Sequence, residues 1–229
     1  MRRVGICAAT VLVLLLAVGS ANAARARSRH EASAKCAPGH SHLITADAQA
    51  QVYLRPEGSG PSGFEAKEIF GCAYGGERAY SLGGVSAFSS RGGGSKSHET
   101  LAGAMVAYES YTELTFPAPA GFQKWQVVVE NLRTGRVLYR VPTGASSPGA
   151  VGVGPVVGLV VKSDGAVAWI VENEIPARHV PAEYELHAVD KTGSRLLASG
   201  SGIDPHSLAL AGSTLYWTQG GKPMSATLN

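Results

Sequence analysis

Short apolar stretches separated by glycine, proline and small polar residues recur along most of the chain. Four segments share one order: an apolar strand, a tight turn of small residues, and a second strand centred on an aromatic residue. They span residues 42–57, 98–113, 157–174 and 206–221, and their aromatic residues are Tyr53, Tyr108, Trp169 and Trp217. Apolar and aromatic runs joined by such turns are typical of β-hairpins. The pattern therefore predicts four related hairpins.

A second hairpin is predicted after each of the first three. Its turn contains Gly76, Gly135 or Gly193, and each glycine is flanked by runs rich in valine, leucine, tyrosine or isoleucine. The fourth hairpin is followed by only one more short candidate strand, PMSATLN. The predicted units are residues 42–84, 98–144, 157–202 and 206–229, of which the last is incomplete.

Units of four strands that recur at roughly 50–60 residues predict a β-propeller. One twisted sheet cannot bury both of its faces alone, whereas a sheet between two similar sheets can. We therefore expect an all-β chain that forms a small four-bladed β-propeller with an incomplete last blade. The alternatives are a β-sandwich and a partial propeller completed by oligomerisation. The open edge of the last blade makes it a candidate surface for homo-oligomer formation.

The last unit also resembles a known family. Its residues LYWT, within the stretch 213–228, resemble the strand motif of YWTD-type secreted propellers, where a turn and an outer strand follow. The resemblance implies a propeller blade. Gln219 follows this motif where the family carries an aspartate, so the receptor function of the family is not carried over.

The N-terminus predicts export from the cytoplasm. Arg2 and Arg3 precede an apolar run, and the run is followed by the triplet Ala21-Asn22-Ala23, which suits a signal peptidase. We expect a signal peptide over residues 1–23, a flexible tail over 24–40 and a single β-propeller-like domain over 41–229. The protein would be secreted or otherwise extracytoplasmic, without stable membrane insertion after cleavage. An uncleaved anchor is the alternative, although the apolar run is short for a span.

Two cysteines, Cys36 and Cys72, remain after this cleavage. In an exported protein they predict a disulfide bond, because two cysteines allow only one intramolecular pairing.

The net charge of the chain adds little to the prediction of its function. The chain has 20 Lys and Arg against 17 Asp and Glu, and without Arg2 and Arg3 the formal charge falls from +3 to +1. Such a balance does not favour nucleic acid as a partner.

Candidate chemistry is predicted at the loops before the first strand and after the second strand of each unit. In propellers these loops gather on one face, and loops carry function while sheets hold them. The loops concerned are 57–67, 83–100, 115–124, 142–156, 174–183 and 200–206. The candidate binding residues in or beside them are His42, His98, His206, Arg178, His179 and Phe122.

Three of these histidines share one position. His42, His98 and His206 precede the aromatic residue of their unit by 11, 10 and 11 residues, so each is predicted to start an innermost strand. Converging imidazoles could bind a transition metal. The alternative is that each histidine only satisfies a local backbone group at a junction between loop and strand.

Signatures of catalysis are absent from the sequence. There is no GxSxG elbow, and the glycines at 152–158 precede no helix that could bind a phosphate. The aromatic residues of the repeated hairpins are expected in the core. We therefore expect no cofactor and a non-enzymatic protein that binds an unknown protein, glycan or peptide through its loop face. The alternative is a metal-dependent hydrolase or lyase that uses the three histidines.

Overall fold

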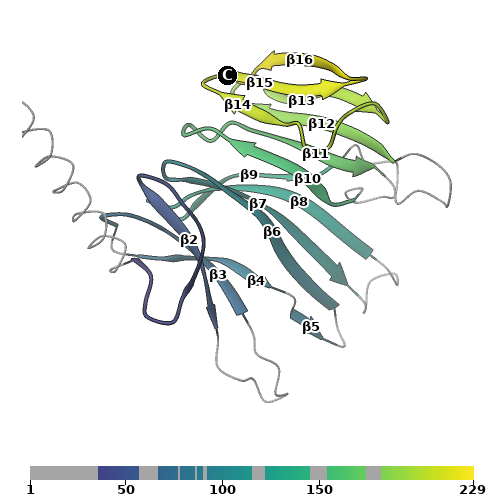
Figure 1. The fold of residues 1–229 in the computed structure, drawn as a ribbon. Coiled ribbons are helices and arrows are strands. Elements are labelled where there is room, and N and C mark those ends of the chain that lie inside the picture. The colour runs from purple at the N-terminus through teal and green to yellow at the C-terminus, as the bar shows by residue number, and fades with distance from the viewer. Residues whose placement is uncertain are drawn as a thin grey trace, which may run out of the picture.

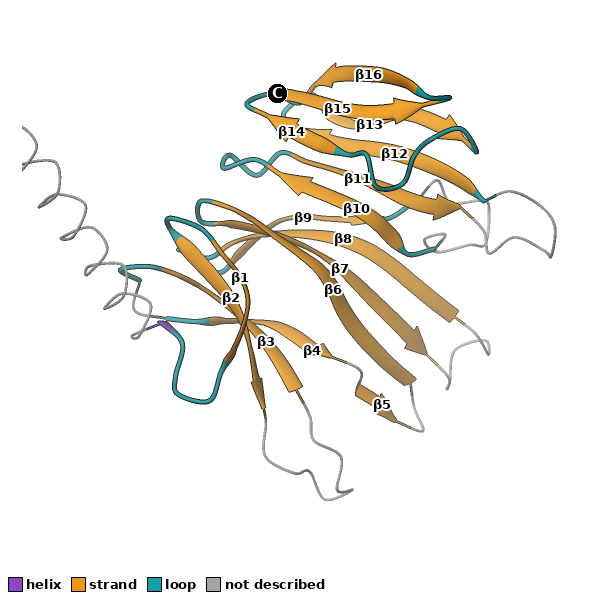
Figure 2. Ribbon diagram, in the orientation of Figure 1, coloured by secondary structure: helices purple, strands orange, loops and turns teal. Residues whose placement is uncertain are grey.

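The computed structural model describes residues 36–56, 67–76, 78–85, 87–89, 92–114, 122–144, 154–173 and 182–229. In this part of the chain the fold is all-β, with four antiparallel sheets (Figures 1 and 2). Sheet 1 contains β1 (His42–Ala46), β2 (Ala50–Pro56), β3 (Lys67–Ala73) and β4 (Tyr80–Val85). Sheet 2 contains β5 (Ala87–Ser89), β6 (Gly92–Ala102), β7 (Met105–Leu114), β8 (Phe122–Asn131) and β9 (Arg136–Pro142). Sheet 3 contains β10 (Val156–Val161), β11 (Val167–Asn173), β12 (Glu183–Asp190) and β13 (Gly193–Gly200). Sheet 4 contains β14 (Ala209–Ala211), β15 (Thr214–Gln219) and β16 (Lys222–Thr227).

Every sheet is a meander in which strands adjacent in sequence pair with one another. The predicted hairpins are therefore confirmed, and so is the smaller fourth unit, whose sheet has three strands. The second unit differs from the prediction. Its inner strand begins at Gly92 and not at His98, because β7 continues to Leu114 and Gly92 pairs with that residue. A glycine-rich stretch that was expected to be a loop is thereby part of the sheet.

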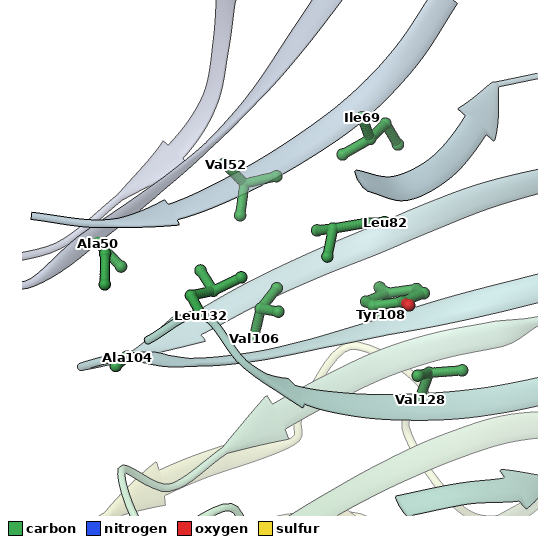
Figure 3. Packing of buried hydrophobic residues seen from close by; sticks show 10 residues of the cluster. Ala50, Val52, Ile69, Leu82, Ala104, Val106, Tyr108, Val128 and Leu132 are labelled. Atoms are coloured by element: carbon green, nitrogen blue, oxygen red, sulfur yellow. The ribbon is translucent and has the colours of Figure 1, made fainter. Parts of the chain in front are cut away.

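Consecutive sheets pack face to face through separate hydrophobic clusters. Sheets 1 and 2 enclose the cluster in Figure 3, which includes Val52, Ile69, Leu82 and Tyr108. Further clusters join sheet 2 to sheet 3 and sheet 3 to sheet 4. None of the clusters in the described part of the chain joins sheet 4 to sheet 1. Figure 1 accordingly shows sheet 1 and sheet 4 at opposite ends of the row.

The aromatic residues of the four hairpins are buried, as expected. Tyr108 packs in the junction between sheets 1 and 2, Trp169 in that between sheets 2 and 3, and Trp217 in that between sheets 3 and 4. Tyr53 is buried on the other face of sheet 1, where its ring stacks on Phe70. Three of these four residues thus hold neighbouring sheets together, as the prediction of core packing requires.

The predicted disulfide bond is present between Cys36 and Cys72, whose Cα atoms lie 5.9 Å apart. It ties the start of the described chain to β3. Such bonds persist in oxidising compartments, so it is consistent with an extracytoplasmic location. The predicted signal peptide and most of the predicted tail lie outside the described residues. No helix in the described segments has the length and apolar character needed to cross a bilayer.

Candidate functional site

A group of polar side chains lies between sheets 2 and 3, next to the apolar cluster that joins them. Toward the turns that connect β6 to β7 and β10 to β11, the junction is apolar and contains Val129, Val161 and Val167. Toward the other end the junction contains Glu109, which is only 2% exposed. We call the end of the molecule that carries the connections β7–β8 and β9–β10 the loop end. The polar group around Glu109 lies on the loop-end side of the junction.

A β-bulge in β6 places His98 beside Glu109. Ser97 pairs with Glu109 and Thr100 pairs with Ala107, so β6 has one more residue than β7 between these pairs. Side chains of consecutive strand residues normally point to opposite faces, but a bulge can redirect one of them. His98 has a φ of 56°, in the left-handed region that non-glycine residues seldom adopt. The local backbone thus accepts strain where it directs the imidazole toward the side of the sheet that faces sheet 3.

Glu109 is the centre of this group. Its Oε2 accepts a hydrogen bond from the Ser97 hydroxyl at 2.5 Å and lies 3.4 Å from Nδ1 of His98. Its Oε1 accepts the backbone N–H of Val156 at 2.7 Å. A buried carboxylate without such partners would cost several kcal/mol, so these contacts are what keep Glu109 in the junction. Through Val156, the same carboxylate fixes the first residue of β10 and hence the position of sheet 3.

The electrostatic environment makes His98 more basic. The hydrogen bond to Glu109 raises its pKa above the usual 6.5, as do the charges of Glu109 and Glu99, while partial burial opposes them. Its side chain is 42% exposed, so the imidazole can meet both Glu109 and solvent. Because Nδ1 is directed at a carboxylate, Nε2 is the ring atom that can form a hydrogen bond with a bound molecule. We call Ser97, His98 and Glu109 the His98 centre.

Two aromatic side chains lie next to the His98 centre. Tyr111 follows Glu109 by two residues on β7, so both side chains are on the face toward sheet 3. Trp125 on β8 pairs with Tyr111 in register, and the two ring centroids are 4.2 Å apart at an interplanar angle of 40°. Both residues are half-buried. They lie next to the His98 centre on its loop-end side, one same-face position beyond Glu109 along β7.

A second polar pair belongs to the interior of the same junction. Nε2 of His187 lies 2.8 Å from Oε2 of Glu185, and Nδ2 of Asn173 donates to Oε1 of the same carboxylate at 3.0 Å. The imidazole ring stacks on Trp169 at 5.4 Å, and the indole N–H donates to the carbonyl of Thr143. The residues His187 and Glu185 are 9% and 8% exposed, respectively. This pair is a hydrogen-bonded part of the core.

The three predicted histidines lie in different local settings. His42 begins β1, and His98 lies within the bulge of β6. His206 lies in the connection before β14, where its backbone N–H donates to the Asp204 carboxylate. Across the described residues, no group of three or more His, Cys, Asp or Glu side chains could hold a metal ion. Of the three, only His98 is held against a buried acid.

The remaining predicted candidates carry less information. Arg178 and His179 lie outside the described residues. Phe122 is the first residue of β8, and its side chain also lies outside the described part.

The sequence pattern indicates His98 but not Glu109, Ser97, Tyr111 or Trp125. Glu109 and Tyr111 alternate with Tyr108 and Ser110 along one strand, so the segment has polar and aromatic side chains on both faces. An acidic residue directly after the apolar and aromatic run 105–108 was the one available signal. The bulge that brings His98 to it could not be read from the residues. No protein-family model matches the chain, and no curated protein is significantly similar to it in sequence.

Proposed function

We propose that this is an exported, non-enzymatic binding protein that takes its ligand at the loop end, with the His98 centre as the contact site. The observation that carries the proposal is the strained His98 backbone, which directs an imidazole at the buried carboxylate of Glu109. An apolar pair would hold the two sheets together without the cost of a buried charge. Strain and buried charge at one place are typical of functional sites.

The chemistry of the His98 centre favours binding over turnover. Glu109 accepts hydrogen bonds from Ser97 and Val156 and lies against Nδ1 of His98, so its contacts are with the protein and its role is to position the imidazole. His98 supplies the contact, because Nε2 can accept a hydrogen bond when the ring is neutral and donate one when it is protonated. A metal-dependent hydrolase gains no support from the described residues, since no group of three ligands is found among them.

Export and architecture belong to the same proposal. The N-terminal residues have the pattern of a signal peptide, and the Cys36–Cys72 bond suits the compartment to which it leads. We also infer that the four sheets are propeller-like blades. The support is that one strand from each sheet, in the order β1, β6, β10 and β14, contacts the corresponding strand of the next sheet.

A binding screen with matched variants tests the function. The mature protein is applied to glycan and peptide arrays, and each ligand found is titrated against His98→Asn, Glu109→Gln and His206→Asn. Asparagine tolerates the left-handed conformation at position 98, so this variant removes the imidazole with little added strain. We expect binding that weakens roughly tenfold or more in the first two variants and is unchanged in His206→Asn, as loss of a charge-assisted hydrogen bond implies.

Two results would overturn the proposal. One is a ligand that the His98→Asn variant binds with wild-type affinity while the variant keeps the wild-type circular dichroism spectrum. The other is the absence of any ligand for the wild-type protein on both arrays.

A further inference from the structure

The outer face of sheet 4 is exposed and uncharged. Leu215 and Trp217 on β15 pack against sheet 3, so the residues that alternate with them point to the opposite face. By strand register, this outer face carries two side chains from β14, three from β15 and three from β16, and none of them is charged. Those exposed to solvent are Ala209, Ala211, Tyr216, Pro223, Ser225 and Thr227. Lys222, the one charged residue of these strands, pairs with Gln219 on the face toward sheet 3. We call the uncharged surface the sheet 4 face.

The residues of the sheet 4 face resemble those that already join sheets in this molecule. At the junction between sheets 3 and 4, Ala168 and Ala188 pack with larger side chains such as Leu215. The sheet 4 face likewise combines two alanines with one large ring, Tyr216, which is 47% exposed. Sheets 2 and 3 have a neighbouring sheet on both faces, whereas among the described residues the sheet 4 face has none. A further sheet of the same kind is therefore the partner that its composition favours.

The other end of the row does not offer a matching face. On the outer face of sheet 1, Tyr53, Phe70 and Cys72 are buried. Sheet 4 of one copy therefore finds no free face on sheet 1 of another, and a head-to-tail row of molecules is not favoured. Two sheet 4 faces can instead pack on each other about a twofold axis, which is the commonest symmetry of protein oligomers. Residues near such an axis meet their own copies, so an uncharged face avoids repulsion between like charges.

We propose that the protein forms a weak homodimer in which the sheet 4 faces of two copies pack on each other, with Tyr216 of each copy in the contact. The inference goes beyond the proposed function and does not depend on the His98 centre. The sequence indicates the open edge of the last unit as the surface for homo-oligomer formation, whereas the structure favours its face. The edge strand β16 carries Lys222 and Pro223. A charge and a residue without a backbone N–H both hinder the addition of another strand.

The size of the sheet 4 face limits the strength of the dimer. Stable interfaces contain roughly 20–30 residues on each side, and this face is much smaller. We therefore expect a dissociation constant of roughly 10–100 µM. A polysaccharide surface is the main alternative occupant. It fits less well, because sugar sites combine aromatic surface with precisely placed polar groups, and this face has a single ring.

Sedimentation velocity of the mature protein between about 5 µM and about 1 mM measures the association. Wild type should shift from monomer to dimer over this range and do so equally in high salt, because no charge pair holds the contact. Tyr216→Arg places like charges near the twofold axis and should raise the dissociation constant tenfold or more. Ser225→Lys, on the neighbouring strand, should have the same effect. Leu196→Arg on β13 is the matched control, since it adds the same charge at a residue that is 53% exposed on another sheet.

Three results would overturn the dimer. One is a wild-type protein that stays monomeric up to about 1 mM, whether or not it binds an insoluble polysaccharide. Another is an unchanged dissociation constant in both Tyr216→Arg and Ser225→Lys, with the wild-type circular dichroism spectrum retained. The third is association that slows hydrogen exchange only at the edge amides of β16, which would mean strand pairing. His98→Asn should dimerise like wild type, so failure of the dimer leaves the proposed function untouched.

Discussion

At the scale of single residues, His98 combines an uncommon backbone conformation with a raised pKa. The hydrogen bond to Glu109 is the main cause of that shift, and the charge of Glu99 acts in the same direction. A group whose pKa is higher in the folded than in the unfolded protein binds its proton more tightly after folding. Protonated His98 therefore stabilises the fold, and it does so through a contact between β6 and β7.

This linkage predicts a pH-dependent effect of His98→Asn. The stabilisation from His98 is fully present below the unfolded pKa of about 6.5 and is lost as pH rises through the higher folded pKa. The urea midpoint of His98→Asn should therefore fall furthest below that of wild type under mildly acidic conditions, and the difference should shrink toward alkaline pH. Urea unfolding between about pH 5 and pH 9 measures it. A difference that is independent of pH would contradict the linkage, and His206→Asn serves as the control.

At the scale of strands and turns, the hairpins could be predicted because their signals are local. The turn at residues 163–165 has Asp164 accepting the N–H of Ala166 and Gly165 at a φ of 94°, as the sequence Ser-Asp-Gly indicates. The start of β6 was predicted too late, because consecutive glycines are poor strand formers. Their extended state depends on pairing with β7 and not on their own preference. The bulge at His98 and its approach to Glu109 likewise depend on partners that are distant in sequence.

The entry into β10 is held by a close backbone contact, which predicts sensitivity at Gly154. Its φ is 94°, and a Cβ there would clash with the backbone carbonyl of Glu172, which cannot move as a flexible side chain would. Gly154→Ala should lower the free energy of unfolding by about 3 kcal/mol. It should also disturb the neighbouring Val156–Glu109 hydrogen bond and thereby weaken ligand binding.

Gly193 is the matched control for this substitution. Its φ of 107° is also unsuited to alanine, but a Cβ there would meet nothing within 4 Å. Gly193→Ala should therefore cost only about 1 kcal/mol of backbone strain and leave the His98 centre intact. Thermal or urea unfolding of the two variants tests the comparison. Equal losses would show that the contact with Glu172 is unimportant.

At the scale of the whole molecule, four sheets lie in a row and each is stabilised mainly by its neighbours. Such an arrangement resembles a repeat protein, in which the total stability is close to the sum of the stabilities of the units and of their interfaces. A substitution in one sheet then destabilises mainly that sheet and its neighbours. Sheets 2 and 3 have packed neighbours on both faces. Sheet 1 packs on sheet 2 with one face, and the Cys36–Cys72 disulfide bond lies at its other face. The His98 centre thus lies in the junction between the two sheets that are enclosed on both faces.

The disulfide bond should therefore stabilise sheet 1 far more than the binding site. Cys36→Ser removes the bond without leaving a cavity at Cys72, which is 1% exposed. The bond joins residues 36 positions apart, so its loss should cost about 3–4 kcal/mol. Hydrogen exchange should accelerate in β1 to β4, while β10 to β12 stay protected and the His98 signals keep their chemical shifts. A reducing agent should destabilise wild type to a similar extent and leave Cys36→Ser unaffected. Uniform acceleration across all four sheets would contradict the modular description and would mean that the row unfolds as one unit.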